Sequence, residues 1–245
     1  MKAESRPVPP TIEKPRPIWA QTYDFLRRSI VTLRLAPGMN LSESEIAEQL
    51  SISRTPVREA FIRLSEEGFV DIYPQYGTFV APIRTKDVLH AQFVRVSLEC
   101  ALVREFARSA TDAGLDAVRA EIARQRAALR AGNIEAFYEH DEAMHQAMSG
   151  EQRPVWRFVE PAKMHVDRVR HLMLPKDIRG RGLVAEHERI LEALVDRDAD
   201  RAEAAMRDQL DGLVKGLDEF ASRHPDFFDT GERERPARSH KGSSA

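Results

Sequence analysis

The sequence predicts a mostly α-helical protein in which a small N-terminal unit with one β-hairpin precedes a larger all-α helical bundle. Two observations support this fold class. Apolar residues recur at helical spacings of three and four from Ile18, and the pattern changes to strand-like alternation shortly before residue 84. After Thr85 the helical spacing returns and continues almost without interruption, in a region dominated by Ala, Leu, Arg and Glu.

Composition at the two chain ends predicts disordered segments outside these units. Residues 1–17 contain five prolines and few apolar side chains, and residues 229–245 are rich in charged and small residues. The expected organisation is a disordered arm over 1–17, an N-terminal domain over 18–84, an all-α domain over 85–228 and a disordered tail over 229–245.

Local signals place the elements of the N-terminal domain. Ser42 and Glu45 belong to a capping box, Pro56 fits the first turn of the next helix, and Gly68 suits the position after that helix ends. Turn-forming residues at 74–77 predict a β-hairpin. The expected elements are helices over 18–33, 43–50 and 54–66, and strands over 69–73 and 78–80.

The second domain shows the pattern of about six helices. Residues that favour helix starts include Thr85, Asn133 and Asp198. The expected helices span 86–109, 115–131, 134–149, 155–173, 183–196 and 199–222. Helices in such number with short connections predict a bundle.

Composition narrows the class of protein. The 245-residue chain has a net charge of −2, so nucleic-acid binding requires a local basic patch. The sequence contains neither a membrane-length apolar run nor the apolar segment of a secretory signal, which predicts a cytoplasmic protein without membrane partners. The single cysteine, Cys100, excludes an internal disulfide.

The two short helices around residues 51–53 predict a helix-turn-helix. In such a motif the N-terminal residues of the second helix meet base edges and phosphates in the major groove. Here those residues are Ser53, Arg54, Thr55 and Arg58, of which the arginines can bind guanine and the hydroxyls can hold phosphates. Gly77 in the hairpin would allow the backbone to approach the adjacent minor groove closely.

An alternative interpretation is a solvated helix edge. The two arginines could instead pair with Glu45, Glu48 or Glu59, and residues 1–84 contain 11 Lys and Arg against 10 Asp and Glu. A net charge of +1 does not distinguish the two interpretations.

The segment LSISRTPVREAFIRL at 50–64, followed by EGFV at 67–70 and YGTFV at 76–80, resembles the GntR family of bacterial transcription regulators. This resemblance implies a winged helix-turn-helix in which Ser53, Arg54, Thr55 and Arg58 contact operator DNA and Gly77 lies at the wing tip. One position departs from the family pattern, because Ser44 stands where a basic residue often precedes Glu45.

The helical domain resembles the FCD effector domain of the FadR subgroup. The resemblance rests on FYEHDEAMH at 137–145, AEHERILEAL at 185–194 and the helix over 199–210. It implies an FCD-like bundle that binds a small carboxylate, often with a divalent metal, and that forms a homodimer.

Spacing brings three metal-binding residue types together. Asp141 and His145 are four residues apart and leave the same helix face, and His187 lies close in angle to the apolar face of another helix. Imidazole and carboxylate ligands suit Zn, Ni, Mn or Fe. The resemblance implies a third histidine at the position of Gln209, so a metal-free polar cluster is the alternative.

Two residues are candidates for effector binding. Arg95 lies among apolar neighbours in mid-helix, where it could clamp a carboxylate, although a surface arginine would show the same pattern. Gln209 could bond to the effector directly.

The sequence therefore predicts a ligand-responsive regulator that binds double-stranded operator DNA as a homodimer, expected to repress a metabolic operon. The alternative is a metal-dependent enzyme that uses Asp141, His145 and His187 and is fused to a DNA-binding module. The sequence shows neither an HExxH motif nor a phosphate-binding glycine loop, and no catalytic residue is assigned.

Overall fold

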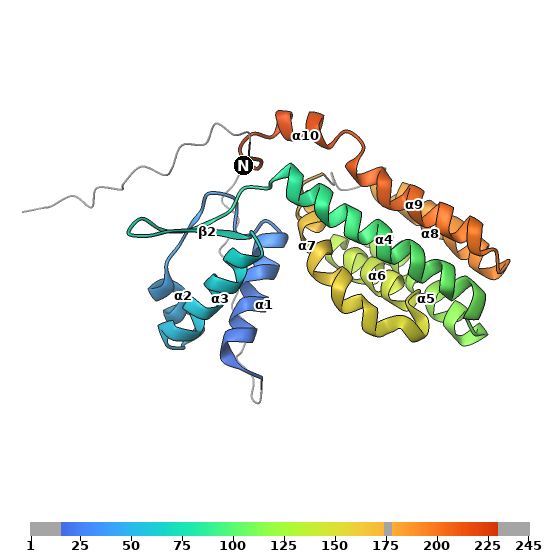
Figure 1. The fold of residues 1–245 in the computed structure, drawn as a ribbon, viewed down its shortest axis with the longest axis horizontal. Helices are drawn as coiled ribbons and strands as arrows, with labels where there is room; N and C mark the ends of the chain where they lie inside the picture. Colours follow the sequence, from blue (N-terminus) through green and yellow to red (C-terminus); the bar gives the residue numbers. More distant parts are fainter. Residues whose placement is uncertain (1–15, 174–177, 230–245) are drawn as a thin grey trace, which may run out of the picture. The chain divides into compact units, whose positions relative to one another are not determined.

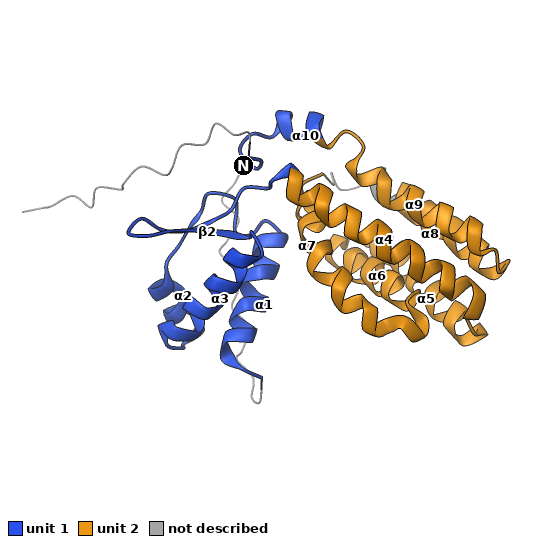
Figure 2. Ribbon diagram, in the orientation of Figure 1, with its two compact units in different colours: residues 1–85, 218–245 blue, residues 86–217 orange. Residues whose placement is uncertain are grey.

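The computed structural model describes residues 16–173 and 178–229, and the side chains of 178–181 are not described (Figure 1). The described chain forms two compact units, one of residues 16–85 with 218–229 and one of residues 86–217 (Figure 2). Nearly all of the expected arm and tail lies outside the described residues. The fold class is confirmed: the protein is mostly helical, with one small sheet in the first unit.

Three helices form the body of the first unit: α1 (Ile18–Val31), α2 (Glu43–Leu50) and α3 (Arg54–Glu66). The predicted cap is confirmed, because the Ser42 hydroxyl accepts a hydrogen bond from the Glu45 amide at the start of α2. Ser51 adopts a left-handed conformation after α2, which turns the chain sharply into α3. Buried Val57 and Phe61 anchor α3 to the core, so its opposite edge faces solvent.

A three-stranded antiparallel sheet of order β1-β3-β2 completes the helix-turn-helix with a wing. The hairpin of β2 (Val70–Tyr73) and β3 (Gly77–Val80) was predicted, whereas β1 (Asn40–Leu41) was not. Two residues are too short a strand to show alternation, and β1 is defined only by its pairing with β3. Gly77 closes the hairpin opposite Tyr73 at a φ of 132°, a conformation that other residues rarely adopt.

The C-terminal segment also belongs to the first unit. After α10 (Leu217–Arg223), the chain forms a parallel bridge between Phe228 and Ile83. The Ile83 amide donates to the Phe227 carbonyl at 2.8 Å, and the Asp229 amide donates to the Ile83 carbonyl at 3.0 Å. Phe228 is fully buried. Residues 218–228 were expected in the helical domain, and their contacts instead group them with the N-terminal unit.

The second unit is an all-α bundle, as expected. Its helices are α4 (Thr85–Ser109), α5 (Asp112–Arg130), α6 (Ile134–Ala147), α7 (Trp156–Met173), α8 (Ile178–Val195) and α9 (Ala199–Val214). A short 3-10 helix, η1 (Gly150–Val155), precedes α7 and was not predicted. The expected helix over 199–222 is interrupted, because Gly216 adopts a φ of 80° and separates α9 from α10.

One apolar core holds the bundle together. Helix α5 packs against α6 and α8, and α8 packs against α9. The core contains the aromatic and sulfur side chains Phe106, Phe137, Met144 and Met206, all buried. Within the described part of the chain, no helix combines the length and the apolar content needed to cross a bilayer.

The bridge between residues 83 and 228 leads to a stability prediction. Replacing Phe228 with Ala should lower the free energy of unfolding of the first unit by about 3–5 kcal/mol, the usual cost of deleting a fully buried phenyl ring. Urea unfolding followed by circular dichroism would measure it. Phe227→Ala is the matched control, because this neighbouring ring is only half-buried and should cost less than half as much. Equal effects of the two substitutions would contradict the assigned role of Phe228.

Candidate DNA-binding surface and buried polar site

The predicted DNA-contacting residues gather at the start of α3. Ser53, Arg54, Thr55 and Arg58 are all exposed, and the arginine side chains remain 62 % and 60 % accessible. They share this unit with the hairpin that carries Gly77. The fold therefore presents two guanidinium groups and two hydroxyl groups to solvent at the N-terminus of the second helix of the helix-turn-helix.

Both arginines pair with Glu43, an acidic residue that was not among the expected partners. Arg54 donates to Glu43 at 2.9 Å, and Arg58 donates to both Glu43 carboxylate oxygens at 2.9 Å. The hydrogen bond from Arg58 is the main cause that lowers the pKa of Glu43, outweighing the opposing effect of burial. The carboxylate therefore carries its charge at neutral pH, and Glu43 takes the place that the sequence assigned to Glu45, Glu48 or Glu59.

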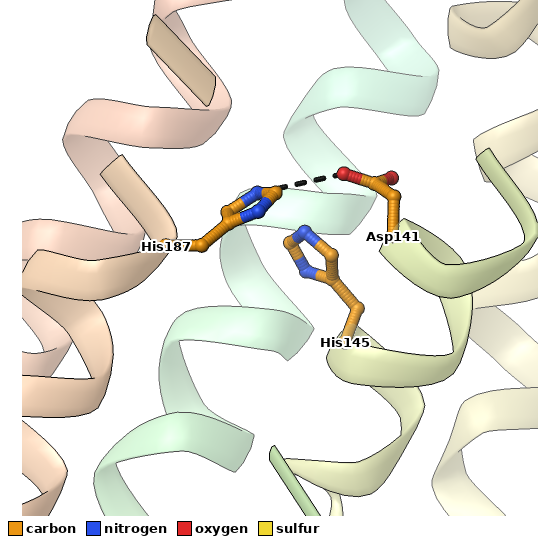
Figure 3. A group of neighbouring side chains, drawn as sticks. All are labelled: Asp141, His145 and His187. Atoms are coloured by element: carbon orange, nitrogen blue, oxygen red, sulfur yellow. Dashed lines mark ion pairs between the residues drawn. The ribbon is translucent and has the colours of Figure 1, made fainter. Parts of the chain in front are cut away.

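The second unit encloses a cluster of three side chains, Asp141, His145 and His187 (Figure 3). Asp141 and His145 extend from α6, and His187 extends towards them from α8. All three are buried, and one ligand atom from each lies within 4.8 Å of the others. The structure thus brings together the three residues that the sequence singled out.

A hydrogen bond to Gln125 fixes the orientation of the His187 ring. The Gln125 amide nitrogen donates to the His140 carbonyl at 3.2 Å, so its oxygen faces His187 Nδ1 at 2.7 Å and accepts the proton there. Burial lowers the pKa of His187 to about 3, so the ring is neutral at pH 7. The lone pair is therefore on Nε2, which points at Asp141 Oδ1 from 3.4 Å.

Two unprotonated acceptors thus face each other among buried side chains. Burial alone would raise the pKa of Asp141, but the charges of Arg170 and His145 hold it well below its usual range. Asp141 Oδ1, His187 Nε2 and His145 Nε2 all lack a hydrogen-bond partner within the described residues. Such an arrangement is costly unless a cation or a donor occupies the space between the atoms.

His145 is oriented by a second carboxylate. Its Nδ1 lies 2.6 Å from Glu99 Oε2, so this nitrogen faces the carboxylate and Nε2 is the ring nitrogen left for the cluster. Glu99 in turn accepts a hydrogen bond from Arg95 Nε at 2.7 Å. Burial raises the pKa of Glu99, but Arg95 and His145 outweigh it and bring the pKa to about 2.

Helix α7 supplies further buried charges. Arg170 donates to Asp141 Oδ2 at 2.7 Å, and Lys163 donates to Asp167 at 2.5 Å. Burial lowers the pKa of Arg170, but the carboxylates of Asp141 and Asp167 more than reverse this shift. Arg170 is therefore charged and covers one oxygen of Asp141, while the other oxygen remains available.

A cavity of about 120 Å³ lies in the same unit. Its polar lining includes Arg95, Arg170 and Gln209, and its apolar lining includes Leu183 and Leu210. Arg95 is 2 % exposed, so it is not the surface arginine of the alternative interpretation. One terminal nitrogen of each arginine, Nη2, and the Gln209 amide oxygen are buried and have no hydrogen-bond partner among the described residues.

Comparison with known proteins decides the family. The pattern described as "Bacterial regulatory proteins, gntR family" matches residues 19–80, and the FCD domain pattern matches residues 90–212. The chain belongs to the GntR family and carries an FCD domain. Regulators of this family bind DNA, and the resemblance inferred from the sequence is confirmed.

Curated relatives of this GntR regulator are also transcription regulators. The HTH-type transcriptional repressor RspR of Escherichia coli K12 is 34 % identical over 215 residues, which is 87 % of this chain and 94 % of RspR. An HTH-type regulator in an unstable DNA locus of Streptomyces ambofaciens is 35 % identical over 219 residues, covering 88 % and 92 % of the two chains. The family and these relatives are regulators and not enzymes, so the enzyme alternative is not supported.

Solved structures share the fold of this GntR regulator. E. coli McbR/YncC superposes with a TM-score of 0.71 at 18 % identity, over 84 % of this chain and 99 % of McbR. A GntR regulator from Rhodococcus sp. RHA1 gives a TM-score of 0.68 at 24 % identity, over 82 % and 97 % of the chains.

Several residues of both sites in this regulator were missed by sequence reasoning. The missed residues are Glu43, Glu99, Gln125, Lys163, Asp167 and Arg170. A signal for one of them, Glu99, was present, because it lies four residues after Arg95 within the apolar phase of α4, which also includes Val88 and Leu102. Opposite charges at that spacing on a buried face predict a buried ion pair.

A ring pair at the end of α7 makes the helical unit sensitive to acid. The His171 ring packs against the Tyr138 ring at a tilt, with the ring centroids 4.4 Å apart, and burial lowers the pKa of His171 to about 4. The neutral ring therefore stabilises the fold above the ordinary histidine pKa, and this contribution is lost as pH falls from about 6.5 to 4.

We expect His171→Gln to flatten the pH dependence of stability over this window. The wild-type free energy of unfolding should fall relative to the variant by up to about 1.4 kcal/mol per pH unit. Urea unfolding at pH values between 4 and 7 would measure the difference. His90→Gln is the control, because His90 is exposed and should leave the slope unchanged. A slope that is the same in wild type and His171→Gln would contradict the assignment.

Proposed function

We propose that this GntR regulator is a cytoplasmic homodimeric repressor. Its binding to operator DNA is controlled by a small carboxylate that binds next to a divalent metal. Ser53, Arg54, Thr55, Arg58 and Gly77 form its DNA contacts. The name of the E. coli relative, a transcriptional repressor, supports the direction of regulation. A metabolic operon as the target fits control by a small acid.

The observation that carries the proposal is the set of buried acceptors that have no donor within the described part of the chain. Asp141 Oδ1, His145 Nε2 and His187 Nε2 are ligand atoms of the kind that Zn, Ni, Mn and Fe prefer. Each of the three side chains also contacts a further residue, Arg170, Glu99 and Gln125 respectively. The residues present therefore fit a divalent metal. Bound there, the metal would supply positive charge and open positions for an acidic ligand.

Gln209 distinguishes this chain from the pattern that the resemblance implies. Its neutral amide oxygen, buried and without a donor among the residues that the structure describes, would bind a metal weakly or accept a hydrogen bond from an effector hydroxyl. Arg95 and Arg170 each have a buried NH2 group beside the same cavity. A cavity of about 120 Å³ with two guanidinium groups suits a small carboxylate.

Exposed apolar side chains support a homodimer through the helical unit. Phe93 on α4 is 75 % exposed, and Leu89 lies four residues before it on the same face. Large apolar residues that are exposed together favour an interface, and a second copy of this chain would cover them. Two winged helix-turn-helix units related by a two-fold axis would also match a palindromic operator.

Metal binding is the sharpest test of the proposal. Protein purified without a histidine tag should contain about one divalent metal per chain by elemental analysis, and calorimetry should detect binding of Zn²⁺ or Ni²⁺ to the stripped protein. His187→Ala should abolish this binding, and Gln125→Leu should weaken it by about 10–100-fold because His187 loses its orientation. Gln209→His should strengthen it by adding an imidazole ligand.

His140→Ala provides the matched control for the metal test. His140 neighbours Asp141 on α6, but its ring pairs with Glu121, so its loss should leave affinity unchanged. Absence of co-purified metal together with no binding at micromolar concentrations would refute the metal site.

DNA contact is tested by the arginines of α3. Arg54→Ala and Arg58→Ala should each weaken operator binding by about 1–3 kcal/mol while the circular dichroism spectrum stays unchanged, and binding should fall steeply with salt. Arg63→Ala is the control on the same helix, where the guanidinium stacks on Trp19, and its effect should be smaller. If both variants bind in mobility-shift titrations as wild type does, the contact assignment is wrong.

A further inference from the structure

One carboxylate on α2 holds both arginines at the start of α3. Glu43 accepts three hydrogen bonds of 2.9 Å, one from Arg54 and two from Arg58. Its side chain is only 22 % accessible, whereas both guanidinium groups are largely exposed. The three groups therefore form a single unit on the surface of the helix-turn-helix, which we call the Glu43 fork.

Folding stability does not account for the fork. Ion pairs between exposed side chains contribute little to stability, because water screens them and because long side chains lose conformational freedom when they pair. Both arginines have buried neighbours, such as Val57, that already anchor α3. We therefore expect the Glu43 fork to affect how the two arginines bind DNA.

Alignment is the first such effect. An arginine that binds a base pair bidentately must give up the freedom of its flexible stem, which reduces affinity. Glu43 restricts both stems before binding while each guanidinium retains free N–H groups, because arginine has five. The cost of ordering the arginines on a base edge is therefore lower with the fork in place.

Charge is the second effect. On DNA of unrelated sequence, arginines bind mainly to phosphates. A carboxylate 2.9 Å from both guanidinium groups is then also near phosphate oxygens and repels them. At a G·C pair, by contrast, arginine can bind guanine O6 and N7 while a carboxylate accepts from the cytosine amino group.

We propose that Glu43 is a specificity-determining residue of this DNA reader, which aligns Arg54 and Arg58 for a G·C pair and opposes their binding to unrelated DNA. Discrimination is a difference of two affinities, and the same carboxylate acts on both in opposite directions. The inference rests on the proposed contacts of the two arginines with DNA.

The experiment compares two duplexes. Wild-type protein first selects binding sequences from a randomised duplex library of about 30 base pairs, which leaves room for two half-sites one or two helical turns apart. Fluorescence anisotropy then measures the affinity for a selected duplex and for a scrambled duplex of the same composition. The ratio of the two affinities is the readout, because a purely structural role would move both affinities together.

Three variants separate alignment from charge. Glu43→Gln should bind the scrambled duplex several-fold more tightly and lower the affinity ratio by about tenfold. Glu43→Asp keeps the charge but is one methylene shorter, so it should lower the ratio without tightening binding to scrambled DNA. Glu48→Gln makes the same charge change at an exposed position on α2 and should leave the ratio unchanged.

The outcomes distinguish this inference from the proposed function. If Arg54→Ala and Arg58→Ala weaken binding but the ratio in Glu43→Gln equals that of wild type or of Glu48→Gln, the role of Glu43 is refuted and the DNA contacts stand. If neither arginine variant weakens binding, the contact assignment itself fails. A Glu43→Asp ratio equal to that of wild type would refute the alignment effect alone.

Discussion

A carboxylate without solvent exposure lies inside the helical bundle, and its charge must be compensated by the residues around it. Asp141 is fully buried and remains ionised. Transfer of an isolated carboxylate from water to a protein interior is costly, so the charge persists only with partners of opposite sign or strong donors. Arg170 provides one such partner for Oδ2.

This requirement extends through three helices. Arg170 on α7 also approaches Asp167, which pairs with Lys163, and Glu99 on α4 contacts His145 on α6. The buried carboxylates of Glu99, Asp141 and Asp167 are thus matched by the cations of Arg95, Arg170 and Lys163. Removing one member would leave the next uncompensated, and for this reason the polar interior fixes how α4, α6 and α7 pack more strictly than apolar contacts alone would.

Local chemistry made much of the fold predictable. Ser42 caps α2 and Gly68 follows α3 in a left-handed conformation, because these residues satisfy the groups at a helix end without help from distant parts of the chain. Elements that depend on pairing with residues far away in the sequence were not predicted. Strand β1 exists only because Asn40 pairs with Phe79, and the bridge at Ile83 requires Phe228.

The same distinction applies to the two sites. Asp141 and His145 could be paired from their spacing on one helix, His187 was added because it lies close to the apolar face of another, and the resemblance to a family gave a second reason for the set. Arg170 and Gln125 were missed, because their importance depends on which helices pack together and sequence spacing contains no such information. Glu43 was missed for the same reason: the sequence offered nearer acidic residues, and only the turn between α2 and α3 brings Glu43 to the arginines.

The bridge between Ile83 and Phe228 also sets the order in which the protein can mature on the ribosome. The backbone groups of Ile83 find their partners among the last residues of the described chain, after the whole helical unit has been synthesised. The unit that contains the helix-turn-helix is synthesised first, but its contacts with residues 218–229 therefore form last. A chain that lacks residues 218–229 would therefore contain every helix from α4 to α9 and still leave the backbone of Ile83 without its partners.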